Sequence, residues 1–291
     1  MQTSIDQFLF AENRELYERS TIAVITVKIL FTAKEIVSML SDPLFYAVAI
    51  PAVLISSISK GGLGGGLGVL SVPLMSLVIP PMQAAAIMLP ILCFIDLFAL
   101  RSFRGTFDKE NLKTLIPAAL FGIVTGTLFF NKLSTSHIKL LVGLISIVFA
   151  FNWIYQTLFG LSQKIKPAGR IRGFIYGSVA GFTSFNVHAG GPPINMYLLP
   201  QKMDKTLFVG TTVIFFTVVN YSKLIPYAFL GLLDFSNLKA SLVLMVLAPV
   251  GVKIGVWAHH KLHDNWFYWI CYVALFVTGL KLSYEGFTGI I

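Results

Sequence analysis

The chain has 291 residues, of which 56% are hydrophobic and only 12% are charged, and its mean hydropathy is +0.79. A soluble globular domain carries roughly 25% charged residues because its surface must be wetted, so most of this surface is expected to face lipid. The net charge is +9, but the basic residues lie between apolar segments, where they set membrane orientation. Nucleic-acid binding is therefore not expected.

The cysteines and histidines give no sign of a metal or cofactor. Cys93 and Cys271 lie inside apolar segments, and neither their spacing nor their setting indicates a disulfide framework or a metal site. His259, His260 and His263 lie in a basic loop and are expected to be solvated. No metal and no cofactor is predicted.

The first predicted element is an extra helix within 20–43, after an N-terminal tail at 1–19 that lacks the pattern of a cleaved signal peptide. Its apolar part, 20–40, has about the 20 residues needed to cross a bilayer. Lys28 and Glu35 fall on one helical face. The segment therefore either spans with that face turned inward or lies along the interface, and we favour spanning.

A first half is predicted at 44–160. Its apolar region 44–80 is interrupted at 60–68 by KGGLGGGLG, in which six of the eight residues 61–68 are glycine. Glycine weakens a helix interior by about 1 kcal/mol per residue, so this region is predicted to be a broken helical hairpin. Three spans follow it, at 82–101, 112–130 and 138–159.

A linker at 161–171 is predicted to be cytoplasmic, because it holds three basic residues and no acid. The second half, 172–291, repeats the arrangement of the first. Its region 172–200 is interrupted at 188–193 by HAGGPP, and a proline costs a helix about 3 kcal/mol. Three further spans follow, at 206–229, 238–258 and 266–284.

The two halves are related in sequence. Gly65 matches Gly190 at an offset of 125 residues, and the loops 105–113 (GTFDKENLK) and 231–239 (GLLDFSNLK) share five of nine residues at an offset of 126. The first loop region is rich in basic residues and is predicted to be cytoplasmic, whereas the second carries one lysine and is predicted to be external. Equivalent loops on opposite sides of the membrane mean that the halves are inverted.

We therefore predict an all-α polytopic membrane protein with two inverted repeats, about seven transmembrane helices and two re-entrant or broken helical hairpins. Its N-terminus would be cytoplasmic and its C-terminus external. Backbone that is not helical survives at membrane depth only where it is buried in protein or lines a wet cavity. Matching helix breaks in inverted repeats indicate a transporter's midplane site, and helix N-termini with glycine backbone suit an anion.

Three segments resemble the sulfite exporter TauE/SafE family: 60–73 (KGGLGGGLGVLSVP), the P-x-x-A-A-A at 81–86, and 181–192 (GFTSFNVHAGGP). The resemblance covers 44–286. It implies a multi-pass protein of the cell inner (plasma) membrane that carries a small sulfur-containing anion, such as sulfite or an organosulfonate. Many members have more glycine where this chain has Asn-Val-His at 186–188, so His188 could be specific to this protein's substrate or coupling.

The candidate substrate-binding residues lie at or beside the breaks: Ser59, Lys60, Gly64, Gly65, Gly66, Gln83, Ser184, Asn186, His188, Gly190, Gly191 and Lys223. One or two of the glycines could instead serve close helix packing. Lys60 either contacts the anion or snorkels from a hairpin tip. His188 donates to the anion, carries a coupled proton, or is a neutral partner of a neighbouring helix. Asn186 and the two serines are neutral donors or helix caps.

Three ionisable residues are weighed by their position in a span. Lys223 lies beside Asn220, deep in its span, and is a better candidate than Lys253 for a second cationic contact with the anion. Asp96 is only five residues before Arg101, so it is expected near the cytoplasmic interface. Lys253 is expected to snorkel.

The favoured function is export of the anion by alternating access, with the anion and the lipid bilayer as partners and a coupled proton as a possibility left open. An ATP-driven pump is disfavoured because no G-x-x-x-x-G-K-[ST] motif exists. An anion channel is the alternative, and an intramembrane enzyme is less favoured because few candidate nucleophiles or bases converge. The sequence indicates neither the particular anion, nor the direction and coupling ion of transport, nor the oligomeric state.

Overall fold

The computed structural model describes residues 42–129, 134–160, 165 and 167–290. The chain divides into two compact units, residues 1–45 and 46–291. Of the first unit only 42–45 are described, so the predicted helix at 20–40 lies outside the described residues. Over its described part, the second unit has helices as its only regular structure.

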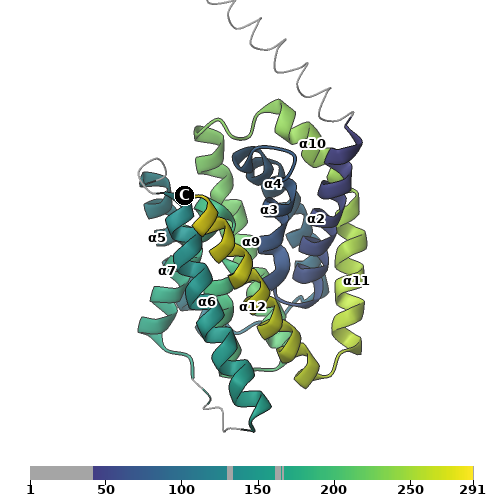
Figure 1. Cartoon of the computed structure of the whole chain (residues 1–291). Helices are drawn as coiled ribbons and strands as arrows, with labels where there is room; N and C mark the ends of the chain where they lie inside the picture. Colours follow the sequence, from purple (N-terminus) through teal and green to yellow (C-terminus); the bar gives the residue numbers. More distant parts are fainter. Residues whose placement is uncertain (1–41, 130–133, 161–164, 166, 291) are drawn as a thin grey trace, which may run out of the picture. The chain divides into compact units, whose positions relative to one another are not determined.

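The helices follow one another in two similar series (Figure 1). The first series is α2 (Pro43–Gly62), the 3-10 helix η1 (Gly66–Leu70), α3 (Ser71–Met75), α4 (Pro81–Ser102), α5 (Lys109–Leu128) and α6 (Thr135–Leu158). The second series is α7 (Arg170–Val187), α8 (Gly191–Leu198), the 3-10 helix η2 (Leu199–Gln201), α9 (Lys205–Phe229), α10 (Phe235–Met245), α11 (Leu247–Lys261) and α12 (Asp264–Thr288).

Among the described residues, six helices are long and apolar enough to cross a membrane: α2, α4, α5, α6, α9 and α12. The pair α10 and α11 makes a seventh if it is counted as one bent span. The six spans predicted from residue 82 onward are all found, with ends that differ by a few residues. The all-α polytopic class is confirmed. Helix α2, predicted as one arm of a hairpin, is by itself long enough to span.

The predicted span at 238–258 is bent rather than straight. Helices α10 and α11 meet at Val246 with a bend of 47°. Pro249 has no N–H to donate to the carbonyl of Met245, and its ring crowds that carbonyl. A bend about one turn before a proline is the expected result.

Both predicted interruptions are present. Helix α2 ends at Gly62, and Gly64 and Gly65 follow with φ of 64° and 78°, a left-handed backbone that glycine adopts without strain. Helix α7 ends at Val187, and His188 has a left-handed φ of 52° before α8 begins at Gly191. A left-handed backbone is uncommon for a residue with a side chain, so the second break is a specific structure.

The repeated loop motif has the same geometry in both halves. Gly105 and Gly231 turn the chain with φ of 81° and 69°. Three residues later an aspartate caps the next helix: Asp108 accepts a hydrogen bond from the Asn111 backbone N–H at 2.7 Å, and Asp234 accepts one from Asn237 at 2.8 Å. The shared G-x-x-D-x-x-N pattern therefore specifies a turn followed by a capped helix.

Glycines allow two pairs of helices to approach closely. A Cβ atom at Gly62 of α2 would lie 2.2 Å from the carbonyl oxygen of Gly255 in α11. A Cβ atom at Gly181 of α7 would lie 2.1 Å from the carbonyl oxygen of Ala119 in α5. Both distances are too short for non-bonded atoms, so small residues set the separation of these helices.

Helices α6 and α12 lie side by side and run in opposite directions (Figure 1). Lys139 near the start of α6 pairs with Glu285 near the end of α12 at 2.9 Å. Trp153 near the end of α6 stacks on Tyr272, with 3.9 Å between the ring centroids. Helices α4 and α9 also pack against each other, and both contribute to the site between the breaks.

Candidate functional site

A cavity of about 30 Å³ lies between the two helix breaks. Six of the predicted residues line it: Lys60, Gly65, Ser184, His188, Gly191 and Lys223. Since one water needs about 10–15 Å³ on this measure, the cavity holds about two waters. A sulfur oxyanion is larger than that, so its entry requires side chains or helices to move.

The two breaks meet at this cavity. A Cβ atom at Gly191, the first residue of α8, would lie 3.4 Å from the carbonyl oxygen of Gly65 and 3.8 Å from the Cα of Gly66. The backbones of the two glycine-containing segments therefore lie next to each other, although 125 residues separate Gly65 from Gly190. The two breaks can share one site only because they are adjacent in space, as expected from the sequence.

Lys60 provides a cation from the last turn of α2. It is 6% exposed, and its Nζ lies 2.5 Å from Oδ1 of Asp96 in α4. The second carboxylate oxygen, Oδ2, accepts a hydrogen bond from Nδ2 of Asn220 in α9 at 2.8 Å. Asp96 is fully buried within the protein, and its pairing with Lys60 was not expected from its place in the sequence. Lys60, Asp96 and Asn220 thus join three helices.

Lys223 provides a second cation from α9. Its side chain is fully buried, and its Nζ donates to the carbonyl oxygen and to Oγ of Ser184 at 3.2 and 3.1 Å. Within the described residues it has no carboxylate within ion-pairing distance. A buried lysine whose partners are neutral leaves positive charge available for an anion.

His188 has one ring nitrogen bonded and one without a partner. Its Nε2 lies 3.0 Å from the hydroxyl of Tyr227, and that hydroxyl donates to the carbonyl oxygen of Phe185 at 3.0 Å. Because the hydroxyl proton is used there, Nε2 must carry the hydrogen that His188 donates to Tyr227. Nδ1, which has no partner among the described residues, is then an acceptor in the neutral ring and a donor only in the charged one.

Sequence reasoning missed a polar residue on the short helix α8. Asn195 is 1% exposed, and neither its Oδ1 nor its Nδ2 has a hydrogen-bond partner within the described part of the chain. A Cβ atom at Gly66 would lie 2.8 Å from this Nδ2, so the amide faces the glycine-rich segment. Buried amides normally have hydrogen-bond partners, so the unpartnered amide of Asn195 is a candidate to bind a ligand. Its proximity to the prolines at 192 and 193 was the available signal.

The other predicted residues do not line the cavity: Ser59, Gly64, Gly66, Gln83, Asn186 and Gly190. Several of them hold the breaks in shape. Ser59 accepts a hydrogen bond from the Leu67 N–H at 2.9 Å, and Asn186 donates to the carbonyl oxygen of Phe182 at 2.9 Å. A Cβ atom at Gly190 would lie 2.9 Å from the Cβ of Ser184.

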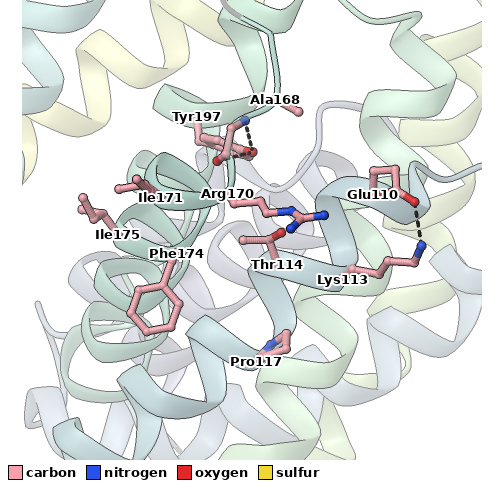
Figure 2. Close-up of a pocket in the computed structure, with 11 residues that line it drawn as sticks. Glu110, Lys113, Thr114, Pro117, Ala168, Arg170, Ile171, Phe174, Ile175 and Tyr197 are labelled. Carbon is pink, nitrogen blue, oxygen red and sulfur yellow. Dashed lines mark hydrogen bonds and ion pairs between the residues drawn. The ribbon is translucent and has the colours of Figure 1, made fainter.

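A larger groove of about 760 Å³ lies at the surface between α5 and α7 (Figure 2). Lys113 and Glu110 form an ion pair across 2.6 Å in its rim, with side chains that are 69% and 74% exposed. Phe174, Ile171 and Ile175 supply an apolar wall. This groove is open and its Lys113–Glu110 pair is exposed, whereas the charged groups of the cavity between the breaks are buried.

Apolar helices of spanning length around a buried cationic cavity define a multi-pass membrane protein with a polar site in its interior. Its residues 49–282 match the family described as Sulfite exporter TauE/SafE, and the chain belongs to that family of transporters. No curated protein and no solved structure matches the chain. The family implies a small anionic substrate.

Proposed function

We propose that this protein is a secondary transporter of the cell inner membrane that exports a small sulfur-containing anion, sulfite or an organosulfonate. One observation carries the proposal: Lys60 and Lys223 line one buried cavity, and Asp96 is the only carboxylate bonded to either in the described residues. With both ammonium groups protonated, two cations and one carboxylate give the site a net charge of +1. Buried charge of that sign calls for an anion, since an uncompensated buried charge is unfavourable.

Alternating access between two inverted halves is the mechanism that we propose. The capped loops after Gly105 and Gly231, the opposed directions of α6 and α12, and the two breaks that meet all support a pseudo-twofold relation. In inverted-repeat transporters one set of elements rocks against the other around a fixed midplane site. The small volume of the cavity is consistent with a closed site that opens to one side at a time.

Flux measurements on purified protein in proteoliposomes test this function. Vesicles loaded with sulfite, an alkanesulfonate, thiosulfate, acetate or chloride should show saturable efflux of one or more sulfur anions and little efflux of acetate or chloride. Accelerated exchange in a counterflow assay indicates a carrier, whereas a channel gives no counterflow. A protein that transports none of the sulfur anions contradicts the proposal.

A change at the second break supplies a further test of the site. His188→Asn keeps a side chain that tolerates a left-handed backbone but removes the imidazole. We expect weaker sulfite binding or an altered pH dependence of binding, measured by titration of the purified protein. Binding that is the same as in the wild-type protein at every pH would make the role of His188 structural, through its bond to Tyr227.

A further inference from the structure

One carboxylate lies directly behind two residues that line the cavity. Asp96 is fully buried, its Oδ1 accepts from Lys60 and its Oδ2 accepts from Asn220. Ionisable residues buried within membrane-spanning helices occur in proton relays and ion pathways. Resting on the anion transport proposed above, we infer that Asp96 binds a proton that crosses the membrane together with the anion.

The chemistry follows from competition for Lys60. The oxygens of the anion and the ionised carboxylate of Asp96 need the same ammonium group, and they repel each other in a buried site of low dielectric constant. When a proton from water binds to Oδ1, Asp96 becomes a neutral carboxylic acid and Lys60 is free to pair with the anion. When the anion leaves, the O–H bond breaks, the proton returns to water on that side, and Lys60 pairs with Asp96 again.

Proton and anion therefore bind cooperatively and move in the same direction. Each favours the other, because protonation of Asp96 leaves Lys60 without a counter-charge and the anion replaces that counter-charge. Movement of a sulfite dianion with one proton transfers a single negative charge, and an inside-negative membrane potential favours its exit. A sulfonate monoanion with one proton moves without net charge, so the potential does not drive it.

The neighbours of Asp96 suit a carboxyl group that changes its charge in place. Asn220 donates to Oδ2 and holds the group whether or not Oδ1 carries a proton. Lys223, also on α9, is the second cation of the site. Cys93 lies one turn earlier on α4, and its carbonyl oxygen accepts from the Tyr221 hydroxyl at 3.4 Å.

Of the other elements packed against α4, α10 carries Lys239 and α11 carries Lys253, His259, His260 and Lys261, and none of these side chains lines the cavity. Helix α3 has no titratable side chain. Lys239 of α10 lies over the ring of Phe235, with 4.6 Å from Nζ to the centroid. His259 of α11 has Nδ1 at 3.1 Å from the carbonyl oxygen of Gly62.

His188 is the competing proton carrier, because it also lines the cavity and its Nδ1 has no partner in the described part of the chain. The structure favours Asp96 because its ionisation directly determines whether Lys60 is available. Protonation of His188 would add a cation but would release no existing pair. The two assignments therefore differ in which substitution removes proton coupling.

Proton coupling is separated from transport by a comparison of four proteins in proteoliposomes: the wild-type protein, Asp96→Asn, His188→Asn and Glu285→Gln. Glu285 is the matched control, a carboxylate paired with Lys139 between α6 and α12 and absent from the lining of the cavity. Counterflow of radiolabelled sulfite at equal pH reports exchange. The steady-state sulfite ratio under an imposed gradient of one pH unit reports coupling. Sulfite's own acid–base equilibrium affects every variant equally.

Transport of one proton per anion changes the steady-state ratio about tenfold per pH unit, relative to a variant that carries none. We expect that response from the wild-type protein and from Glu285→Gln. Asp96→Asn should lose the response at whatever rate of counterflow it retains. A response that Asp96→Asn retains, or that only His188→Asn loses, overturns the proposal. Wild-type protein without counterflow of any of the sulfur anions contradicts the proposed function, whereas counterflow without a gradient response contradicts only the coupling.

A second measurement decides the matter if Asp96→Asn fails to fold or shows no counterflow. Wild-type protein in weakly buffered detergent is titrated with methanesulfonate and with sulfite, and proton uptake is followed with a pH-sensitive dye. Methanesulfonate does not titrate near neutral pH, and the uptake due to sulfite itself is subtracted with a blank. About one proton taken up per bound anion supports the proposal. Anion binding without proton uptake, or no binding of either anion, overturns it.

Discussion

Replacement of Lys223 by methionine is expected to weaken anion binding without weakening the fold. Lys223 is fully buried, and its partners are the carbonyl oxygen and hydroxyl of Ser184 rather than a carboxylate. Methionine has a similar length and removes a buried charge, and such replacements are often neutral or stabilising. The anion would lose one charge-assisted hydrogen bond, worth about 1.5–3 kcal/mol. Its affinity should fall roughly 10- to 150-fold.

Two measurements on purified protein test this expectation. Sulfite binding is titrated, and thermal unfolding is followed by tryptophan fluorescence. Lys253→Met is the matched control, since Lys253 is an exposed lysine of α11 that does not line the cavity, and it should bind sulfite like the wild-type protein. A folded Lys223→Met protein whose sulfite affinity stays within about threefold of wild type would refute the reasoning, because a contact with a charge is worth more than that.

Three further predictions concern stability, each measured by thermal or denaturant unfolding in detergent. Gly65→Ala should lower the free energy of unfolding by about 1–2 kcal/mol, because φ at this position is 78°. Gly65→Asn should lower it less, since asparagine tolerates a left-handed backbone. Equal losses in the two variants would argue that the backbone conformation is not the cause. Gly62→Ala should be more harmful than Gly65→Ala, because its Cβ would meet the backbone of Gly255 at 2.2 Å and force α2 from α11. Asp108→Ala and Asp234→Ala should each cost about 1 kcal/mol through loss of a helix cap, and an unchanged stability in either would contradict the capping role.

The predictions that succeeded depend on short-range physics. The spans follow from runs of apolar residues that a bilayer requires, and the first break follows from glycines that do not hold a helix. The loops at 105–113 and 231–239 contain their own turn and cap, so their motif specifies a structure without help from distant residues. Five of the six spans predicted from residue 82 onward are single helices for the same reason, and the sixth, 238–258, is the bent pair α10 and α11.

The features that the sequence did not reveal are contacts between distant residues and one bend. Asp96 was weighed only by its distance from Arg101 and its pairing was not predicted, although an acidic residue within an apolar helix is already a sign of a functional site. Its partner Lys60 lies 36 residues away in the chain. The bend at Val246 was missed as well, although Pro249 was a visible cause.

By itself the sequence determined that the chain is helical, crosses the membrane several times, and breaks two helices at glycine-rich or proline-rich segments. Only the tertiary structure decided that Lys60 pairs with Asp96, that Lys223 bonds to Ser184, and that both lysines line one cavity. The reason is geometric: contacts between helices depend on their rotation and depth. Those are set by close glycine contacts, such as that of α2 with α11, between residues nearly 200 positions apart.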